Sequence, residues 1–332
     1  MTAPSSAASP AGSAASTTAS VSAGALMRRY AGVGAALVVL ILILSLTQEN
    51  FLKYNNIMNI LRTNSVMFVA AVGLTFVIVS QGLDLSVGSM CALGGVILAE
   101  LLTAGVPAWP AIGLTILACC ALGGLINGGL IAYGGFNFFV VTLAMLQLLR
   151  GAALVISNGT PTSTFMWAPV QWVGDGMVAG FPVPVVIAIV VGVIGYAVMR
   201  WTKFGRAVYA VGGNETAARL AGIDVRRVRF AVYAISAACA GVAAVMLTGR
   251  LTSAQPVSAA VGLELSAAAA VLLGGASFAG GSGNIGGAAI GVLFLGILAN
   301  GITLAGVPSY WQGIATGAVL IAAIALDRIR TR

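Results

Sequence analysis

Long apolar stretches follow one another along this chain, and a single strongly basic window, residues 200–229, interrupts them. The stretches lie near 31–47, 64–81, 87–104, 110–132, 138–156, 183–200, 229–249, 264–278, 285–305 and 311–326. A helix of about 20 apolar residues crosses the hydrocarbon core of a bilayer. Backbone groups in lipid must be paired within the protein, which favours helices. The pattern therefore predicts an all-α polytopic membrane protein with about ten transmembrane helices.

Charge is scarce and unevenly placed. Of 332 residues, 59% are hydrophobic and 7% are charged, which excludes a soluble globular domain. Twelve of the 16 basic residues lie at Arg28 and Arg29, in the basic window, and at Arg328, Arg330 and Arg332. These places flank apolar spans, so the formal charge of +8 indicates membrane topology and no nucleic-acid partner.

The positions of the basic clusters also predict the orientation. Basic loops stay on the cytoplasmic side, so both termini and the basic window are expected there. Six spans before the window and four after it satisfy that condition. We expect residues 1–27, which are rich in Ala, Ser and Thr, to form a disordered cytoplasmic tail. Residues 28–332 form the transmembrane domain, with halves at about 31–156 and 183–326.

Several classes of enzyme are excluded by what the chain lacks. It has no histidine and only eight acidic residues, so neither a catalytic triad nor a metal centre is expected. The glycine-rich string GGSGNIGG resembles a phosphate-binding loop, but its glycines are not followed by lysine. The only lysines are Lys53 and Lys203. The chain therefore has no Walker A motif and is not expected to hydrolyse ATP or to hold a cofactor.

The basic window contains signals for a short helix. Asn214 is a favourable N-cap, the run from Glu215 to Ala221 consists of good helix formers, and Gly222 stands where a C′ glycine belongs. Glu215 and Arg219 form an i,i+4 pair with the acid first. A helix this short is marginal alone in water, so we expect it to dock against a cytoplasmic partner. The alternative is a stop-transfer loop whose charges only fix the topology.

An internal repeat divides the chain. The sequence GLDLSVGSMCALGG at 82–95 recurs as GLELSAAAAVLLGG at 262–275, with seven of fourteen positions identical and Asp84 replaced by Glu264. A second, shorter similarity aligns Asn127 with Asn300. In both similarities the second copy lies five spans after the first, and because five is odd the two halves must have opposite orientations in the membrane. A 5+5 inverted repeat is typical of transporters. The alternative is chance similarity between apolar sequences.

Polar residues inside the spans are costly and are often functional. Candidates for the translocation pathway are Asp84, Ser86, Asn127, Glu264, Ser266 and Asn300. Glu100 and Arg150, each a few residues from the outer end of a span, are expected to form an ion pair. A purely structural role in helix packing is the alternative for each of these groups. A proton relay usually needs several buried acids or histidines, and this chain has few.

Seven segments together resemble a known family. They are GLDLSVGS at 82–89, NGGLIAYGGFNFFVVTLAMLQLLRG at 127–151, SNGTP at 157–161, FGRAVYAVGGNETAARLAGI at 204–223, RLTSAQP at 250–256, LGGASFAGGSG at 273–283 and NGITLAGVPSYWQ at 300–312. They resemble the ribose-type monosaccharide permeases of bacterial ABC importers, from about residue 30 to the C-terminus. The resemblance implies import of a pentose, a hexose or a related polyol across the inner membrane.

The resemblance also implies partners. A separate ATPase subunit binds ATP and Mg, a periplasmic or lipid-anchored binding protein delivers the sugar, and a second permease copy or paralogue completes a dimer. The helix that docks on the ATPase corresponds here to the coupling residues Asn214, Glu215, Ala218, Arg219, Leu220 and Gly222. This chain departs from the family at Ser266, where an acid is usual, and at Phe138, where proline is usual.

Other functions remain open on the sequence alone. An ABC permease for branched-chain amino acids or nucleosides fits the repeat and the absent Walker A motif equally well. A secondary transporter would need a coupling-ion site built from several buried polar groups and would not need a docking helix. An intramembrane enzyme is disfavoured by the absence of histidine and of paired carboxylates at helical spacing.

Overall fold

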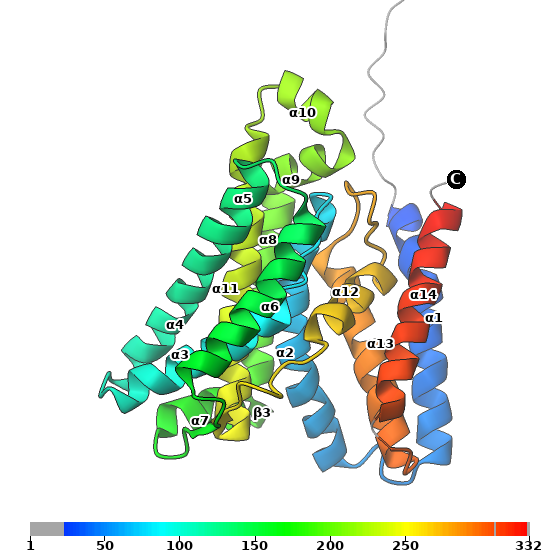
Figure 1. The fold of residues 1–332 in the computed structure, drawn as a ribbon. Helices are drawn as coiled ribbons and strands as arrows, with labels where there is room; N and C mark the ends of the chain where they lie inside the picture. Colours follow the sequence, from blue (N-terminus) through cyan, green and yellow to red (C-terminus); the bar gives the residue numbers. More distant parts are fainter. Residues whose placement is uncertain (1–22, 309, 331–332) are drawn as a thin grey trace, which may run out of the picture.

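The computed structural model describes residues 23–308 and 310–330. Helices make up most of this part (Figure 1). They are α1 (Ala23–Thr47), α2 (Tyr54–Val79), α3 (Val87–Thr103), α4 (Ala108–Leu122), the π-helix η1 (Gly123–Gly128), α5 (Gly129–Ala132), α6 (Phe138–Ile156), α7 (Ala168–Asp175), α8 (Val183–Trp201), α9 (Lys203–Gly213), α10 (Glu215–Leu220), α11 (Val225–Leu251), α12 (Leu263–Leu273), α13 (Ile285–Leu304) and α14 (Tyr310–Arg330).

Two small antiparallel ribbons lie in the connections. Strand β1 (Thr162–Ser163) pairs with β4 (Ser253–Ala254), with Thr162 opposite Ala254. Strand β2 (Met177–Val178) pairs with β3 (Phe181–Pro182), with Val178 opposite Phe181. The first ribbon joins the segment after α6 to the segment after α11, and so ties the two halves of the chain together.

Six helical stretches of the described chain are long and apolar enough to cross a membrane. They lie at Tyr54–Val79, Ala108–Ala132, Phe138–Ile156, Val183–Trp201, Val225–Leu251 and Ile285–Leu304. Shorter apolar helices occur at Gly32–Thr47, Val87–Thr103, Leu263–Leu273 and Tyr310–Ala323. The chain is thus an all-α polytopic membrane protein, as predicted, and every predicted apolar stretch contains a helix.

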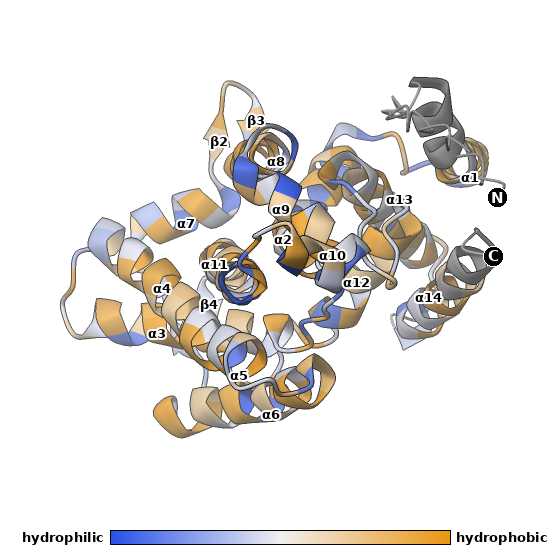
Figure 2. Ribbon diagram, turned by 90° about the horizontal axis from the view of Figure 1, so that it is seen from above, coloured by the Kyte–Doolittle hydropathy of each residue, from blue (hydrophilic) through white to orange (hydrophobic). Residues whose placement is uncertain are grey.

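Helices α2 and α11 stand near the middle of the molecule (Figure 2). Helix α11 packs against α2, α3, α4, η1 and α7. Its buried face is lined with small side chains, including Ser236, Ala237, Ala240 and Ala244. A Cβ atom added to Gly73 of α2 would lie only 2.8 Å from the Cα of Ser236. Small residues allow such close approach between membrane helices.

The other helices flank this centre on two sides. Helices α3 to α6 lie on one side, and α1, α13 and α14 lie on the other (Figure 2). Helix α10 stands at one end of the molecule, and α7 lies at the opposite end (Figure 1). At that opposite end the rings of Trp109 in α4 and Trp172 in α7 meet edge to face, with centroids 6.0 Å apart.

The two copies of the repeated sequence form two short helices, α3 and α12, whose first turns meet. A Cβ atom on Gly88, in the first turn of α3, would overlap the Glu264 carboxylate in the first turn of α12. The far end of α12 continues into a loop that contacts α9, whereas the far end of α3 leads into α4, which contacts α7. Each of the two helices follows an irregular stretch, and irregular backbone is tolerated in membranes where protein surrounds its free backbone groups.

Two boundaries differ from those expected. Helix α2 begins at Tyr54, ten residues before the apolar stretch, because its first turns carry asparagines that hydropathy alone assigns to a loop. Helix α1 begins at Ala23, so only residues 1–22 of the predicted tail fall outside the described residues. Phe138 begins α6 without proline, and the Asn137 side chain caps it by accepting from the N–H of Phe139 at 2.8 Å.

Candidate functional site

The short helix α10 has the local structure expected of it. The Asn214 side-chain oxygen accepts from the N–H of Ala217 at 2.9 Å. At the other end Gly222 has φ +79°, and its N–H donates to the carbonyl of Arg219 at 3.1 Å. The N–H of Ile223 donates to the carbonyl of Ala218 at 3.0 Å. This pair of bonds is a Schellman motif, which requires the left-handed conformation that glycine supplies.

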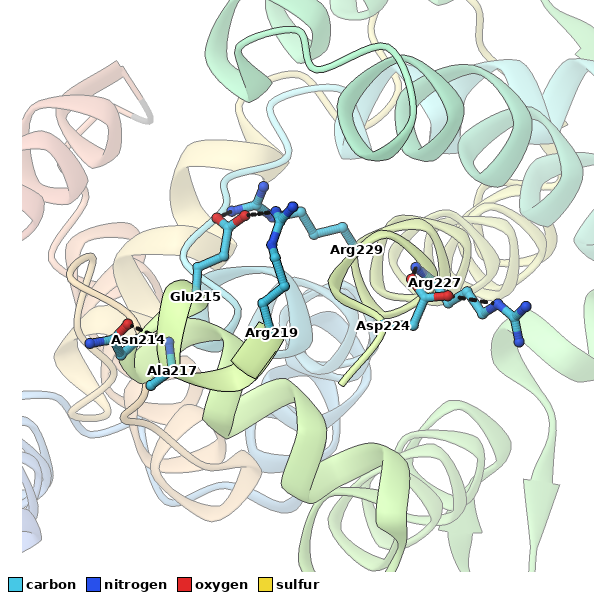
Figure 3. A network of polar contacts seen from close by, with 7 residues as sticks. All are labelled: Asn214, Glu215, Ala217, Arg219, Asp224, Arg227 and Arg229. Atoms are coloured by element: carbon cyan, nitrogen blue, oxygen red, sulfur yellow. Dashed lines mark hydrogen bonds and ion pairs between the residues drawn. The ribbon is translucent and has the colours of Figure 1, made fainter. Parts of the chain in front are cut away.

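An arginine that the sequence did not single out completes this helix. Glu215 forms the expected ion pair with Arg219, and its other carboxylate oxygen pairs with Arg229 of α11 (Figure 3). Burial raises the pKa of Glu215, but the hydrogen bonds and charges of the two arginines outweigh it, so the pKa lies below its ordinary value. Glu215 therefore joins α10 to the start of α11.

The two remaining coupling residues differ in their exposure to solvent. Ala218 is buried against the body, whereas the Leu220 side chain is 86% exposed. Helix α10 projects beyond the apolar helices at its end of the molecule (Figure 1). A large apolar side chain at such a tip offers a contact for a partner, although single exposed leucines also occur without one.

Directly beneath α10, three segments meet through glycines. Gly281 donates its N–H to the carbonyl of Val79 at 2.9 Å. A Cβ atom on Gly212, near the end of α9, would overlap that same carbonyl oxygen, and one on Gly280 would lie 2.5 Å from the carbonyl oxygen of Gly212. The Tyr209 hydroxyl of α9 donates to the carbonyl of Gly283 at 2.7 Å. The segment that carries α10 thus packs on the end of α2 and on the loop after α12.

The first-half pathway candidates form one buried cluster. The Asp84 carboxylate accepts from the Ser86 N–H at 3.0 Å and hydroxyl at 2.6 Å, and from the Ser236 hydroxyl at 2.8 Å. Asn127 donates to the Ser86 hydroxyl oxygen at 2.9 Å. All four are at most 1% exposed. The cluster joins the segment just before α3 to α11 and to the π-helix η1. These residues therefore hold the helices together and are not exposed to open water.

The second-half candidates are arranged differently. Asn300 of α13 exchanges two hydrogen bonds with Asn56 of α2, at 2.8 and 3.1 Å. Glu264 faces Gly88 at the meeting point of α3 and α12 and interacts with the charge of Arg150. The repeat therefore aligns Asn127 with Asn300 in sequence, but the structure does not give them equivalent partners.

The predicted ion pair between Glu100 and Arg150 is wrong. Among the described residues Arg150 has no salt bridge, and its guanidinium donates to the carbonyls of Pro256 and Ala259 at 3.1 and 2.9 Å. Glu100 is exposed on α3. Both residues lie near the outer end of a span, which predicts that they stand at a similar depth in the membrane. It does not predict the direction in which each side chain points from its helix.

Ser266 and Asn300 lie in a groove of about 690 Å³ in the half of the molecule opposite α10. Its walls come from α2, the end of α11, α12, α13 and α14. Arg250 also lines it, and its guanidinium donates to the Asn59 side chain at 3.2 Å. Sequence reasoning missed Asn59 and Asn64 of α2. Asn59 stands in the stretch assigned to a loop, and Asn64 is the first residue of the predicted apolar stretch. Their spacing with Thr63, on neighbouring turns of one helix, is a signal that could have found them.

Comparisons with known proteins agree on one family. The profile of the family described as branched-chain amino acid transport system / permease component matches residues 56–324. The ribose import permease protein RbsC of Escherichia coli K12 is 42% identical over 295 residues, which cover 88% of this chain and 91% of the relative. RbsC of Bacillus subtilis 168 is 42% identical over 88% of this chain and 90% of its own length. The D-allose transport system permease protein AlsC of E. coli K12 is 37% identical over 86% and 87%. No solved structure matches.

Proposed function

This chain belongs to the family of ABC-importer permeases described as branched-chain amino acid transport system / permease component, and we propose that it imports a monosaccharide. One observation supports a monosaccharide as the substrate: the chain is 42% identical, over 88% of its length, to proteins named ribose import permeases. The relative named for D-allose widens the class to pentoses, hexoses and related polyols. A permease component is a transport subunit and not an enzyme, so ATP and Mg belong to a separate ATPase chain.

Helix α10 couples this subunit to the ATPase. Three features support the proposal: both ends of α10 are capped, Glu215 anchors it to α11, and Leu220 is exposed at its tip. Movement of α10 reaches the membrane helices through the glycine contacts of Gly212 with Val79 and with the loop at 280–283. Transport then proceeds by alternating access, with rigid groups of helices rocking about the pathway.

The proposed membrane arrangement has ten spans in a 5+5 inverted repeat. The six long and four shorter apolar helices of the described residues support the count. The opposed directions of α3 and α12, whose first turns meet, support the inversion. Both termini and α10 lie in the cytoplasm, the groove opens on the outer side of the inner membrane, and a second permease copy or paralogue completes the pathway. A periplasmic or lipid-anchored binding protein delivers the sugar to that outer side.

Uptake by cells tests the function directly. The chain is expressed with an ABC ATPase and a sugar-binding protein from its own genome, in a strain that lacks sugar importers. Uptake of radiolabelled ribose, D-allose, leucine and uridine is then measured. We expect uptake of a sugar that requires the ATPase gene. Uptake of leucine or uridine alone would support an amino-acid or nucleoside permease. Sugar uptake that persists without the ATPase would indicate a secondary transporter.

Cysteine labelling tests the orientation of the repeat. On a cysteine-free background, Thr103→Cys after α3 and Ala279→Cys after α12 place thiols at two exposed positions. An impermeant maleimide should label Thr103→Cys only from outside and Ala279→Cys only from the cytoplasm. Labelling of both from the same side would contradict the inverted arrangement.

A further inference from the structure

The groove beside α12 carries an unusual set of polar side chains for a membrane protein. Amides line it from three helices: Asn59 and Asn64 from α2, Asn300 from α13 and Gln312 from α14. The hydroxyls of Ser266 and Thr316 line it as well. We call these six residues the amide groove. Polar side chains at membrane depth face a protein interior or a water-filled path, because exposure to lipid is costly.

Part of this hydrogen-bonding capacity is used within the protein. Asn300 pairs with Asn56, Gln312 donates to Thr303, and Asn64 donates to the carbonyl of Ile60. The hydroxyls of Ser266 and Thr316, in contrast, donate to no group in the described part of the chain. Serine and threonine in helices commonly donate to a carbonyl one turn back, so two unused hydroxyls in one groove leave donors and acceptors for a solute.

The chemistry of the lining selects a neutral polyhydroxylated solute. Among the described residues that line the groove none is acidic, so no anion there pairs with an amino group. The one charged side chain among them, Arg250, donates to the Asn59 side chain at 3.2 Å. None of these lining residues is aromatic, so there is no ring on which a nucleobase could stack. Amides and hydroxyls both donate and accept, as sugar hydroxyls do. Ile60, Leu247 and Leu295 supply apolar surface for the C–H faces of a sugar ring.

We propose that the amide groove holds the monosaccharide transiently on its way through the permease, with Ser266 and Thr316 as its direct hydrogen-bonding contacts. The volume of about 690 Å³ lies within the roughly 300–1,000 Å³ of small-molecule sites. The absence of an aromatic platform keeps the affinity low, which a transport pathway needs, because a tightly held solute would not leave. This inference rests on the proposed function for the choice of a sugar.

Protection of introduced cysteines tests the site without transport. Ser266→Cys and Thr316→Cys are made separately in the full-length, cysteine-free chain, and membranes that contain it are labelled with N-ethylmaleimide. Ribose is added at increasing concentration, and L-proline and uridine serve as comparison solutes. Thr160→Cys, at an exposed position outside the groove, is the matched control. Protection at a ligand concentration [L] follows the factor 1 + [L]/Kd, about threefold at twice Kd.

We expect ribose to slow labelling at both groove positions by at least about threefold at saturating concentrations, with no effect at Thr160→Cys. Equal protection by L-proline or uridine would overturn the proposed selectivity. No reaction at either groove position would show that water does not reach the groove, and would overturn the site. If ribose protects neither groove cysteine while the wild-type chain still imports sugar, this inference alone is refuted. If the wild-type chain does not import sugar, the proposed function is refuted.

Discussion

Arg229, near the start of α11, forms an ion pair with Glu215, the first residue of α10, although the two residues are fourteen positions apart. The side chain of Arg229 is 28% exposed and that of Glu215 is 30% exposed. A second pair close by, Asp224 with Arg227, is more open, at 52% and 82%. The first pair joins two helices, whereas the second lies within the first turn of one helix.

These two pairs give a matched comparison. Arg229→Ala frees α10 from α11, so we expect it to lower ATP-driven sugar uptake by the assembled complex several-fold. Arg227→Ala removes an exposed pair whose contribution is about 0–1 kcal/mol, and it should leave uptake close to wild type. Equal loss in both variants would indicate a general effect of positive charge and not a specific anchor.

The depressed pKa of Glu215 predicts a pH dependence for this anchor. A carboxyl group with a lower pKa in the folded state stabilises the fold above its unfolded pKa, and this contribution is lost as pH falls through the folded pKa. Hydrogen exchange of the α10 amides should therefore be slower in wild type than in Glu215→Gln at neutral pH. The difference should shrink as pH falls below the ordinary carboxyl value of 4.5 and should vanish once the pH is below the folded pKa. A difference of the same size at neutral pH and at pH 3 would contradict the ion-pair assignment.

The glycines beneath α10 allow a comparison of neighbours. A Cβ atom on Gly212 would overlap the carbonyl oxygen of Val79, whereas one on Gly213 would meet nothing within 4 Å. We expect Gly212→Ala to cost about 1–3 kcal/mol through forced displacement of backbone, and to reduce uptake by the complex. Gly213→Ala should be close to neutral in both apparent melting temperature and uptake. Normal uptake by Gly212→Ala would show that this contact does not transmit movement.

The Asp84 cluster predicts a difference between two substitutions at one position. Asp84→Ala would leave the hydroxyls of Ser86 and Ser236 without their acceptor, at a cost of about 1–3 kcal/mol for each unpaired buried group. Asp84→Asn keeps a carbonyl oxygen in place and should retain most of the stability. The apparent melting temperature of the purified chain in detergent distinguishes them, and equal values for Asp84→Ala and wild type would contradict a packing role.

The sequence predicts local contacts in this protein better than contacts between residues far apart in the chain. The caps of α10 were predictable because the hydrogen bonds that form them, from Ala217 to Asn214 and from Gly222 to Arg219, each join residues three positions apart. The partner Arg229 was not predictable, because the sequence does not show how the first turn of α11 is placed relative to α10. The same limit explains the wrong Glu100–Arg150 pair, since hydropathy gives the depth of a residue and not its direction.

The two halves of the repeat show another limit of sequence patterns. Asp84 and Asn127 were chosen as pathway residues because they are polar and repeated, yet both are fully packed among α3, η1 and α11. The counterpart of Asp84 is Glu264, which faces Gly88. Asn300, the counterpart of Asn127, and Ser266, the counterpart of Ser86, line the groove. The groove also depends on Asn59 and Asn64 of α2, which lie outside the repeated sequences, and Asn59 also precedes the predicted apolar stretch. The repeat therefore indicates the architecture better than it indicates the site.

The central claim is that α10 couples sugar import to a partner ATPase, and Gly222 tests it most directly. Gly222 has φ +79° and open space around its Cα, so within this chain a substitution there acts through backbone conformation. Gly222→Val should lose the Schellman turn, at about 1–2 kcal/mol, whereas Gly222→Asn adopts the left-handed conformation more readily.

The decisive measurement is sugar-stimulated ATP hydrolysis by the complex of this permease, its ATPase and its binding protein in proteoliposomes, with uptake of labelled ribose recorded in parallel. We predict that Gly222→Val loses both activities while the binding protein keeps its affinity for sugar, and that Gly222→Asn retains both. If Gly222→Val instead changes which sugars are carried while stimulated hydrolysis stays intact, α10 belongs to a selectivity site and the coupling role is wrong.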